Sequence, residues 1–306
     1  MQLHSPLTGS TNVVLEKEIK CRFIIDSYRK QLDVNVTKYF HDLESIQIYR
    51  CLDTGYRFYY PFDIDGDSKF YEALQKYKWY YMDWKWEHEI ASMIIAPANK
   101  VLEIGCGRGG FLEKMQQKGV KGTGLELNES ALESSRSKGL EVLNQTIQDH
   151  SVEHPAQYDV VCSFQVVEHI AAIKEFMQAS VNVLKPGGKL IVSVPNNDSL
   201  IIKCYPDTAL NMPPHHMGLW NMNSLIKIQR CFDLQVEAIH LEPVQPYHLW
   251  YSYSLVGKRL SREWRNRYGF IASLIPQIAR PITSSSVKAL AEYIIGHTVL
   301  AVYVKL

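Results

Sequence analysis

A short glycine-rich stretch carries the residues of this sequence that are best suited to hold a small ligand. Residues 101–110 read Val-Leu-Glu-Ile-Gly-Cys-Gly-Arg-Gly-Gly, and Phe111, Leu112 and Met115 follow at helical spacing. An apolar run, a glycine turn and an amphipathic helix in this order bring backbone close to a ligand, because glycine adopts turns that other residues avoid. The ligand that this turn holds decides the chemistry of the protein.

Two cofactors compete for the turn. Gly105, Gly107 and Gly110 match the G-x-G-x-x-G pattern, in which a helix N-terminus faces the pyrophosphate of a dinucleotide. Glu103 stands two residues before the first glycine, where its carboxylate would repel a pyrophosphate. S-adenosylmethionine has a sulfonium and an ammonium but no phosphate, so an acidic site suits it. Glu126 ends the next apolar run and can accept hydrogen bonds from the ribose hydroxyls of either cofactor. A turn that serves only tight strand–helix packing is a third alternative.

Three later segments place polar residues after short apolar runs. Asp149 follows the run 140–143, where an acidic side chain can meet the amino group of adenine. Gln165 follows the run 158–164 and is expected to line the methionine portion of the cofactor. Residues 184–195 contain a Pro-Gly-Gly turn before another apolar strand.

In this order and at this spacing, these segments resemble the class I S-adenosylmethionine-dependent methyltransferases, and most of all the small-molecule branch whose fourth-strand motif ends in Glu-His, here Glu168–His169. The resemblance covers residues 90–240. It implies an α/β fold with a doubly wound, mostly parallel, seven-stranded Rossmann-like sheet, and S-adenosylmethionine as the cofactor. The cofactor-binding residues that we expect are Glu103, Gly105, Gly107, Gly109, Glu126, Leu127, Asp149 and Gln165.

The N-terminal region, residues 1–90, is rich in aromatic residues and precedes the cofactor-binding part. Its apolar spacing predicts a helix at 16–31 and another at 68–95. Between them, the strand-like runs 46–51 and 56–61 are joined by Leu-Asp-Thr-Gly, which is typical of a hairpin turn. The hairpin is similar to the zinc knuckles that precede some sugar-tailoring methyltransferases, but it lacks their partner cysteines.

Residues 91–306 are predicted to form the cofactor-binding domain. Strands that alternate with helices indicate a parallel sheet, and ligands bind beyond the carboxyl ends of its strands where the winding direction reverses. The runs 234–241 and 297–304 would supply its last two strands. Between them lies an insertion, residues 243–296, which is long enough to be functional. Together with the N-terminal region, it is the candidate cap that recognises the acceptor.

Methyl transfer from a sulfonium is an in-line displacement, so the enzyme must hold the acceptor atom collinear with the methyl carbon and the sulfur. A hydroxyl acceptor benefits from a general base, and histidine is the common choice at neutral pH. Residues 211–221 include Pro-Pro-His-His, and the prolines fix the neighbouring side chains. We expect His215 or His216 to contact the acceptor or to act as the base; the alternative is that backbone carbonyls satisfy them. His169 is expected to hydrogen-bond the loop that follows it.

The acceptor suggested first is a sugar or glycan hydroxyl. The Pro-Pro-His-His loop resembles that of methyltransferases that tailor bacterial surface polysaccharides, and aromatic side chains suit carbohydrate. A quinone-type or other aromatic small molecule is the alternative, since it would use the same core. A nicotinamide-dependent oxidoreductase and a non-catalytic S-adenosylmethionine-binding protein also remain open. The aromatic residues considered are Tyr77, Trp79, Tyr80, Tyr81, Trp84 and Trp86.

Composition narrows the class of partner. The chain has 306 residues and a formal net charge of +1, and no block of lysine and arginine predicts a nucleic-acid partner. No apolar run reaches the roughly 18 residues of a membrane span, so we expect no stable membrane insertion. Six scattered cysteines favour reduced thiols and a cytoplasmic location. No metal site is expected, because no cysteine pair has zinc spacing and Asp159 lies within a strand.

Overall fold

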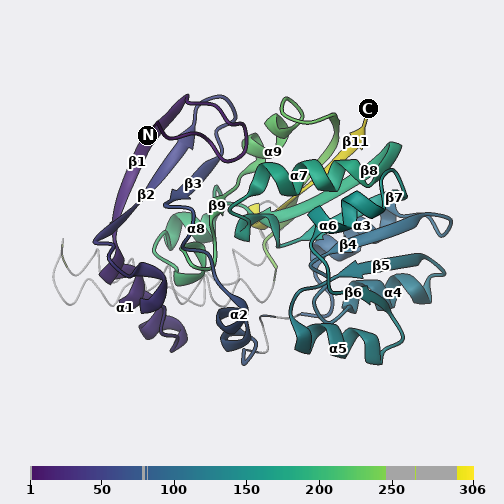
Figure 1. Ribbon diagram of the computed structural model, residues 1–306, viewed down its shortest axis with the longest axis horizontal. Coiled ribbons are helices and arrows are strands. Elements are labelled where there is room, and N and C mark those ends of the chain that lie inside the picture. Colours follow the sequence, from purple (N-terminus) through teal and green to yellow (C-terminus); the bar gives the residue numbers. More distant parts are fainter. Residues whose placement is uncertain (1, 78–79, 81, 246–265, 267–294) are drawn as a thin grey trace.

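The computed structural model describes residues 2–77, 80, 82–245, 266 and 295–306, and it contains two sheets (Figure 1). The larger sheet has seven strands in the order β10-β11-β8-β7-β4-β5-β6. Its strands are β4 (Lys100–Ile104), β5 (Lys121–Leu125), β6 (Glu141–Leu143), β7 (Tyr158–Phe164), β8 (Leu184–Pro195), β10 (Leu234–Pro243) and β11 (Ile295–Lys305).

Strands β4 to β8 pair in parallel, whereas β11 runs antiparallel to both β8 and β10. The expected doubly wound sheet is therefore confirmed, including its reversed strand. The chain moves outward from β4 through β5 to β6 and then returns to β7 on the other side of β4. The winding thus reverses between β4 and β7, where parallel sheets bind ligands.

Helices cover both faces of this sheet, which explains why its strands read as continuous apolar runs. Val161 packs on the face shared with Phe176 and Met177 of α7. Val160 and Cys162 point to the opposite face, toward the side of α3 and α4. The helices are α3 (Trp86–Ile94), α4 (Gly110–Gln117), α5 (Glu129–Ser137), α6 (Ile147–Glu153), α7 (Ile173–Asn182), α8 (Leu200–Cys204) and α9 (Met222–Ile228).

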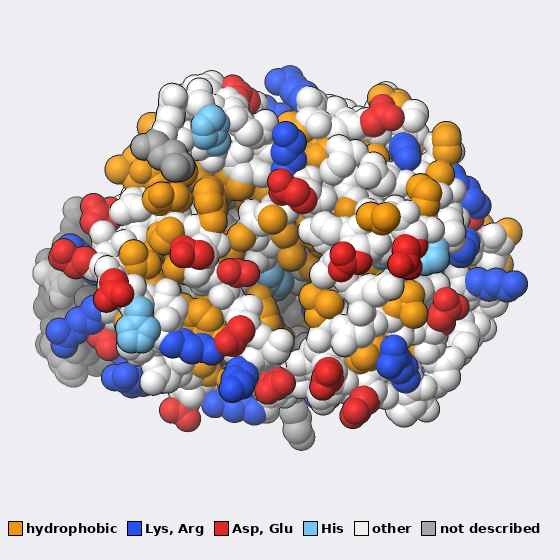
Figure 2. All heavy atoms as spheres, in the orientation of Figure 1, with side chains coloured by type: hydrophobic (Ala, Val, Ile, Leu, Met, Phe, Trp, Pro, Cys, Tyr) orange, Lys and Arg blue, Asp and Glu red, His pale blue; other side chains and the backbone are white. Residues whose placement is uncertain are grey.

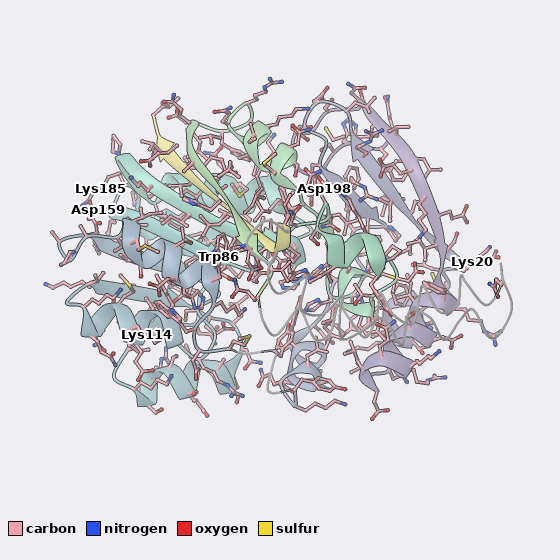
Figure 3. All side chains as sticks on the ribbon, turned by 180° about the vertical axis from the view of Figure 1, so that it is seen from behind. Lys20, Trp86, Lys114, Asp159, Lys185 and Asp198 are labelled. Carbon is pink, nitrogen blue, oxygen red and sulfur yellow. The ribbon has the colours of Figure 1, made fainter. Side chains whose placement is uncertain are left out.

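An ion pair joins the amino ends of two central strands. The Asp159 carboxylate, on β7, lies 2.7 Å from the Lys185 ammonium at the start of β8 (Figure 3). The backbone N–H of Lys100, at the start of β4, also donates to Asp159. This charged edge is opposite to the carboxyl ends of the strands, so Asp159 takes no part in the ligand-binding edge.

The smaller sheet has four strands in the order β1-β2-β3-β9. The predicted hairpin is confirmed as the antiparallel pair β2 and β3. The helix predicted at 16–31 begins later, as α1 at Cys21, because the preceding residues hydrogen-bond along β2 as strand β1. The elements here are β1 (Val13–Lys20), α1 (Cys21–Leu32), β2 (Ser45–Cys51), β3 (Arg57–Tyr60), α2 (Ser68–Leu74) and β9 (Gly218–Leu219).

The single helix predicted at 68–95 is wrong. Helix α2 ends at Leu74 and α3 begins at Trp86, after Lys85 in an extended conformation. Between them the backbone of Asp83 crosses the glycine turn so closely that a Cβ on Gly110 would lie 2.6 Å from the Asp83 carbonyl oxygen. The chain leaves the helix to cover that turn. Trp79 and Tyr81 lie outside the described residues.

The loop that carries Pro-Pro-His-His joins the two sheets. Met212, Met217 and Leu219 pack in one apolar cluster with Ile24 and Tyr28 of α1, and β9 extends the smaller sheet. Apart from its ends and residue 266, the insertion expected at 243–296 lies outside the described residues. Within the described part of the chain, no helix combines the length and the apolar character needed to cross a bilayer.

Candidate functional site

A cavity of about 1500 Å³ lies beyond the carboxyl ends of the central strands. The space-filling view shows the surface hollowed between the regions of the two sheets (Figure 2). The cavity is larger than the roughly 300–1000 Å³ of an ordinary small-molecule pocket, so it has room for two ligands. The predicted site residues that line it are Glu103, Gly105, Gly107, Glu126, Leu127, Gln165, His215 and His216.

The glycine turn is held against β5 by its own backbone. The N–H groups of Gly105 and Cys106 both donate to the Leu125 carbonyl oxygen, at 2.8 and 3.1 Å. Gly105 has a φ of +70°, and a Cβ there would lie 2.5 Å from Cγ2 of Val166. A side chain is therefore excluded both by backbone conformation and by lack of space.

Glu126 is fixed by two backbone donors. Its Oε2 accepts from the N–H of Gly107, and its Oε1 accepts from the N–H of Asn128, each at 2.8 Å. Each carboxylate oxygen can accept further hydrogen bonds, so the group can bind a pair of hydroxyls on the cavity side. Leu127, next to it, is 56% exposed and lines the cavity.

Glu103 is a buried carboxyl group without a partner. It is 4% exposed, and its Oε2 makes no hydrogen bond within the described structure. Burial, reinforced by the negative charge of Glu126, raises the pKa of Glu103 well above its usual range. An unpaired buried acid beside a cavity calls for a cationic or hydrogen-bonding ligand. The ammonium of S-adenosylmethionine fits this requirement.

Two predicted cofactor residues do not line the cavity. Asp149 is exposed in the first turn of α6, where its carboxylate accepts from Thr146 Oγ1 at 2.6 Å and its N–H donates back to the same oxygen. Gly109 is the left-handed N-cap of α4, and a Cβ there would lie 2.4 Å from Cδ1 of Leu140. Residues 145–148 line the cavity beside Asp149, and Gly107, Arg108 and Gly110 line it beside Gly109.

Gln165 reaches a residue that sequence reasoning missed. It has a φ of +56°, and its side-chain Nε2 donates to Oε1 of Glu87 at 3.3 Å. Glu87 is buried at the start of α3 and also lines the cavity. The pattern of residues around Glu87 does not predict this role, because a single helix was expected at 68–95 and the start of α3 was not recognised.

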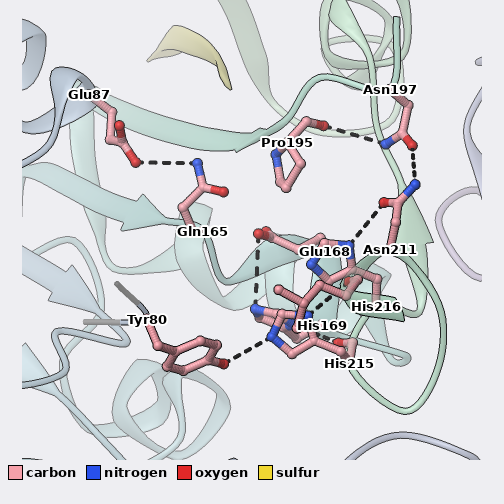
Figure 4. Close-up of polar contacts among 11 residues, drawn as sticks. Tyr80, Glu87, Gln165, Glu168, His169, Pro195, Asn197, Asn211, His215 and His216 are labelled. Atoms are coloured by element: carbon pink, nitrogen blue, oxygen red, sulfur yellow. Dashed lines mark hydrogen bonds and ion pairs between the residues drawn. The ribbon is translucent and has the colours of Figure 1, made fainter. Parts of the chain in front are cut away.

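Three histidines meet at the other end of the cavity, and we call His169, His215 and His216 the histidine cluster (Figure 4). One ring nitrogen from each lies within 4.8 Å of those from the other two. Each Nδ1 faces an oxygen that can only accept: His169 faces the His215 carbonyl at 2.6 Å and His215 the Leu210 carbonyl at 2.9 Å. The neutral rings therefore carry their hydrogen on Nδ1 and expose Nε2 as an acceptor.

The ring of His216 is oriented by two asparagines. Its Nδ1 lies 3.2 Å from Oδ1 of Asn211. Asn211 donates through Nδ2 to Oδ1 of Asn197, which in turn donates to the Trp220 carbonyl. This chain fixes the amide orientation, so the Asn211 oxygen faces the imidazole. The predicted candidate base thus has a defined tautomer with Nε2 as its acceptor.

Burial keeps the cluster neutral. It lowers the pKa of His169 to about 4 and holds the pKa values of His215 and His216 well below the ordinary histidine range. His215 Nε2 lies 2.9 Å from the Tyr80 hydroxyl, which donates to it. The bond of His169 to the His215 carbonyl spans 46 positions of the sequence, so His169 bonds this distant loop rather than the loop that follows it.

Glu168 adds a buried acid beside the cluster. It is 1% exposed, and burial raises its pKa to about 8. Its Oε1 lies 4.0 Å from His169 Nε2, and its Oε2 has no hydrogen-bond partner within the described structure. The backbone carbonyl of Glu168 accepts from the N–H of Met217 at 2.8 Å, which ties the end of β7 to the histidine loop.

Comparison with known proteins identifies the family to which this chain is similar. The protein family described as "Methyltransferase domain" matches residues 79–239. The ubiquinone biosynthesis O-methyltransferase of Shewanella halifaxensis is 30% identical over 188 residues, which are 58% of this chain and 75% of that protein. The enzyme of the same name from Klebsiella pneumoniae is 33% identical over 105 residues, 32% of this chain and 43% of that protein. The chain thus spans less than half the length of some curated relatives that it matches.

Solved structures agree in fold. The crystal structure of a SAM-dependent methyltransferase from Archaeoglobus fulgidus has a TM-score of 0.52 at 18% identity, and it covers 77% of this chain and 100% of its own. That of a SAM-dependent methyltransferase from Thermotoga maritima, titled a possible histamine N-methyltransferase, has a TM-score of 0.51 at 15% identity, with 78% and 98% coverage. At these identities the likeness concerns the fold alone.

Proposed function

We propose, on the premise that the chain belongs to the class I S-adenosylmethionine-dependent methyltransferases and uses S-adenosylmethionine as its cofactor, that it methylates a hydroxyl oxygen of a small aromatic molecule of quinol type. One observation carries the proposal. The same cavity is lined by the glycine turn and by all three residues of the histidine cluster. A methyl donor at the first and an acceptor hydroxyl at the second would meet inside it.

The cofactor is assigned to the end of the cavity at β4 and β5. Glu103 and Gly105 hold the methionine portion, since an unpaired buried acid is complementary to an ammonium. Glu126 accepts from the ribose hydroxyls with a carboxylate already fixed by two backbone donors. Leu127 and Gln148 flank the adenine, with Gln148 in the role first expected of Asp149.

His216 is the proposed general base. When bound, S-adenosylmethionine supplies an electrophilic methyl group on a sulfonium. His216 would accept the hydroxyl proton on Nε2, while Glu103, Gly105 and Glu126 would hold the cofactor that supplies the methyl group to the acceptor oxygen, with the bonding electron pair left on its sulfur. Burial lowers the pKa of His216, so the ring is neutral at neutral pH and has a lone pair that can take a proton, although the same shift makes it a weaker base. Asn211 holds the tautomer that leaves Nε2 as the acceptor.

Two observations favour an aromatic acceptor over a sugar. The relatives named above are ubiquinone biosynthesis O-methyltransferases, and no comparison supports a glycan acceptor. Two aromatic residues contact the histidine cluster directly, and one of them, Tyr80, belongs to the set that first suggested carbohydrate. Tyr71 packs edge-on against His169, and Tyr80 donates to His215. They build an aromatic wall beside the base, which suits a flat ring.

The test is a comparison of acceptors by mass spectrometry. Purified protein is incubated with S-adenosylmethionine and, separately, with catechols, hydroquinones, monosaccharides and nucleotide sugars. We expect a gain of one methyl group on the phenolic acceptors. Methylation of the sugars alone would overturn the aromatic assignment and restore the glycan interpretation. Formation of S-adenosylhomocysteine is followed in parallel, so that transfer to any acceptor is detected.

A further inference from the structure

The histidine cluster also has the construction of a metal site, although the sequence predicted none. We propose that His169, His215 and His216 bind one divalent transition-metal ion, with zinc as the first candidate, at the acceptor end of the cavity. Imidazole nitrogens suit zinc, copper, iron and nickel, whereas magnesium and calcium prefer oxygen.

The first observation is proximity. One ring nitrogen from each histidine lies within 4.8 Å of the other two. Nitrogens bound to one zinc ion at about 2.0–2.1 Å in a tetrahedral arrangement are about 3.3 Å apart. Modest rotations of the rings would close the cluster onto an ion. Within the described residues, no other group of three histidine, cysteine or carboxylate side chains brings its ligand atoms this close together.

The second observation is the support behind the rings. Histidines that bind metals almost always donate their other ring N–H to a carbonyl or carboxylate, which fixes the tautomer and the ring orientation. Here each Nδ1 faces an oxygen acceptor: the His215 carbonyl, the Leu210 carbonyl and the Asn211 amide oxygen. With the hydrogen on Nδ1, the Nε2 atoms are the candidate ligands, although the Gln165 carbonyl also lies beside the His169 ring. A single histidine that acts as a base needs an acceptor behind its own Nδ1 only. In this cluster, all three rings have such an acceptor.

The third observation is the buried acid. Glu168 is 1% exposed, its Oε2 lacks a hydrogen-bond partner, and its Oε1 lies 4.0 Å from His169 Nε2. Within the described part of the chain, no lysine or arginine forms an ion pair with it. A buried carboxyl group is stabilised by a nearby cation. An ion bound to His169 would supply that charge.

One existing contact must change. The Tyr80 hydroxyl lies 2.9 Å from His215 Nε2 and uses the lone pair that an ion would take. Binding therefore either displaces this hydroxyl or recruits it as an oxygen ligand. Both outcomes alter the surroundings of Tyr80, so its ultraviolet absorption is an internal reporter of the ion.

The role of the ion rests on the proposed function. Three protein ligands leave a coordination position for an oxygen, as in catalytic zinc sites, and a bound hydroxyl becomes more acidic. In the metal-bound protein, the histidine nitrogens would hold the acceptor oxygen through the ion, and the more acidic hydroxyl would lose its proton to solvent in the cavity rather than to His216.

The experiment measures metal binding without any acceptor. Full-length protein without a histidine tag is freed of metal with a chelator and titrated with CoCl₂ and ZnCl₂, by visible absorption and by calorimetry. We expect one ion per chain, with the intense d–d absorption of a four- or five-coordinate cobalt site. His169→Gln and His215→Gln are each expected to lose stoichiometric binding. His297→Gln is the matched control, because His297 lines the same cavity outside the cluster.

A graded variant guards against misfolding. Asn211→Ala removes the acceptor behind His216 and is expected to weaken binding about 10- to 100-fold. Affinity for S-adenosylhomocysteine, unchanged in each variant, verifies the fold. Absence of stoichiometric binding, or binding that all the cluster variants retain, overturns the metal site. Because no acceptor is present, failure of the quinol proposal leaves this result untouched, and failure of the metal site leaves the acceptor comparison untouched.

Discussion

The two ends of the cavity are built in different ways. The cofactor end uses residues at the carboxyl ends of adjacent parallel strands: Glu103 lies near the end of β4, Gly105 directly follows β4, and Glu126 directly follows β5. The acceptor end collects His169 from the short 3-10 turn Val167–His169 after β7, His215 and His216 from a distant loop, and Tyr80 from the N-terminal side. One end is local in sequence, whereas the other depends on tertiary packing.

This difference separates two kinds of specificity. Strand ends are fixed by the hydrogen bonds of the sheet, so the cofactor end is rigid and suits the one donor common to the family. The acceptor end is held by Met217, which packs with the N-terminal region and bonds the backbone of Glu168. Loops on a rigid scaffold change more readily than strands do. Substrate choice is therefore expected to reside at the histidine end.

The largest expected effect is a loss of turnover without a loss of cofactor affinity, after a substitution at the acceptor end of the cavity. His216→Ala should lower turnover of the acceptor by about 10²- to 10⁴-fold, since a general base typically contributes that factor. Affinity for S-adenosylhomocysteine should stay unchanged, because His216 lies at the other end. Mass spectrometry of the methylated acceptor measures turnover, and calorimetry measures the affinity for S-adenosylhomocysteine. His154→Ala, which changes the histidine directly after α6, outside the cavity lining, is the control; full turnover in His216→Ala would refute the base.

The second expected effect is a loss of cofactor affinity, after a substitution at the cofactor end of the cavity. Glu126→Ala removes the proposed acceptor of both ribose hydroxyls, and hydrogen bonds to a charged group contribute about 1.5–3 kcal/mol. The Kd of S-adenosylhomocysteine should therefore rise roughly 10- to 150-fold. Calorimetry measures it, with Glu129→Ala on the exposed start of α5 as the control. Equal affinity in the two variants would remove Glu126 from the cofactor site.

The same contrast explains what the sequence could predict. The parallel part of the sheet and the lining by Glu103 and Glu126 follow from local patterns of apolar runs and glycines, whereas the reversed strand is what the resemblance to the methyltransferases implies. Asp149 was expected at the adenine edge; it does not line the cavity, and it bonds Thr146 at the start of α6. Threonine and an acidic residue three positions apart are typical of a helix N-terminus. The sequence therefore already indicated that Thr146 could occupy the Asp149 carboxylate in place of adenine.

Other parts of the site had no local signal. The Tyr80 hydroxyl bonds His215. This contact was not predicted, because a single helix was expected at 68–95, whereas α2 ends at Leu74 and α3 begins at Trp86. His169 and His215 are 46 positions apart, and their bond depends on the packing of the intervening loop. Neither contact can be derived from the spacing of residues along one element.

A third prediction sharpens the assignment of Glu103. Burial and the charge of Glu126 raise its pKa, so the free protein holds this carboxyl protonated at pH values where an ordinary glutamate is ionised. Binding an ammonium favours the carboxylate and releases the proton. Affinity for S-adenosylhomocysteine should therefore increase with pH, by up to about tenfold per unit for one proton. Calorimetry in two buffers of different ionisation enthalpy measures the release, and Glu103→Gln should abolish it. Wild-type binding without proton release would contradict the pairing.

The smallest effect probes the wall of the acceptor end. Tyr80→Phe keeps the ring but removes the hydroxyl that donates to His215. A neutral hydrogen bond contributes about 0.5–1.5 kcal/mol, so turnover should fall roughly 2- to 12-fold with cofactor affinity unchanged. Tyr77→Phe is the matched control, since its hydroxyl donates instead to the Leu32 carbonyl of α1. If both variants lose the same activity, the loss reflects general packing of the N-terminal region. A loss confined to Tyr80→Phe assigns the hydroxyl to the histidine cluster, and thus ties an N-terminal residue to the chemistry at the far end of β7.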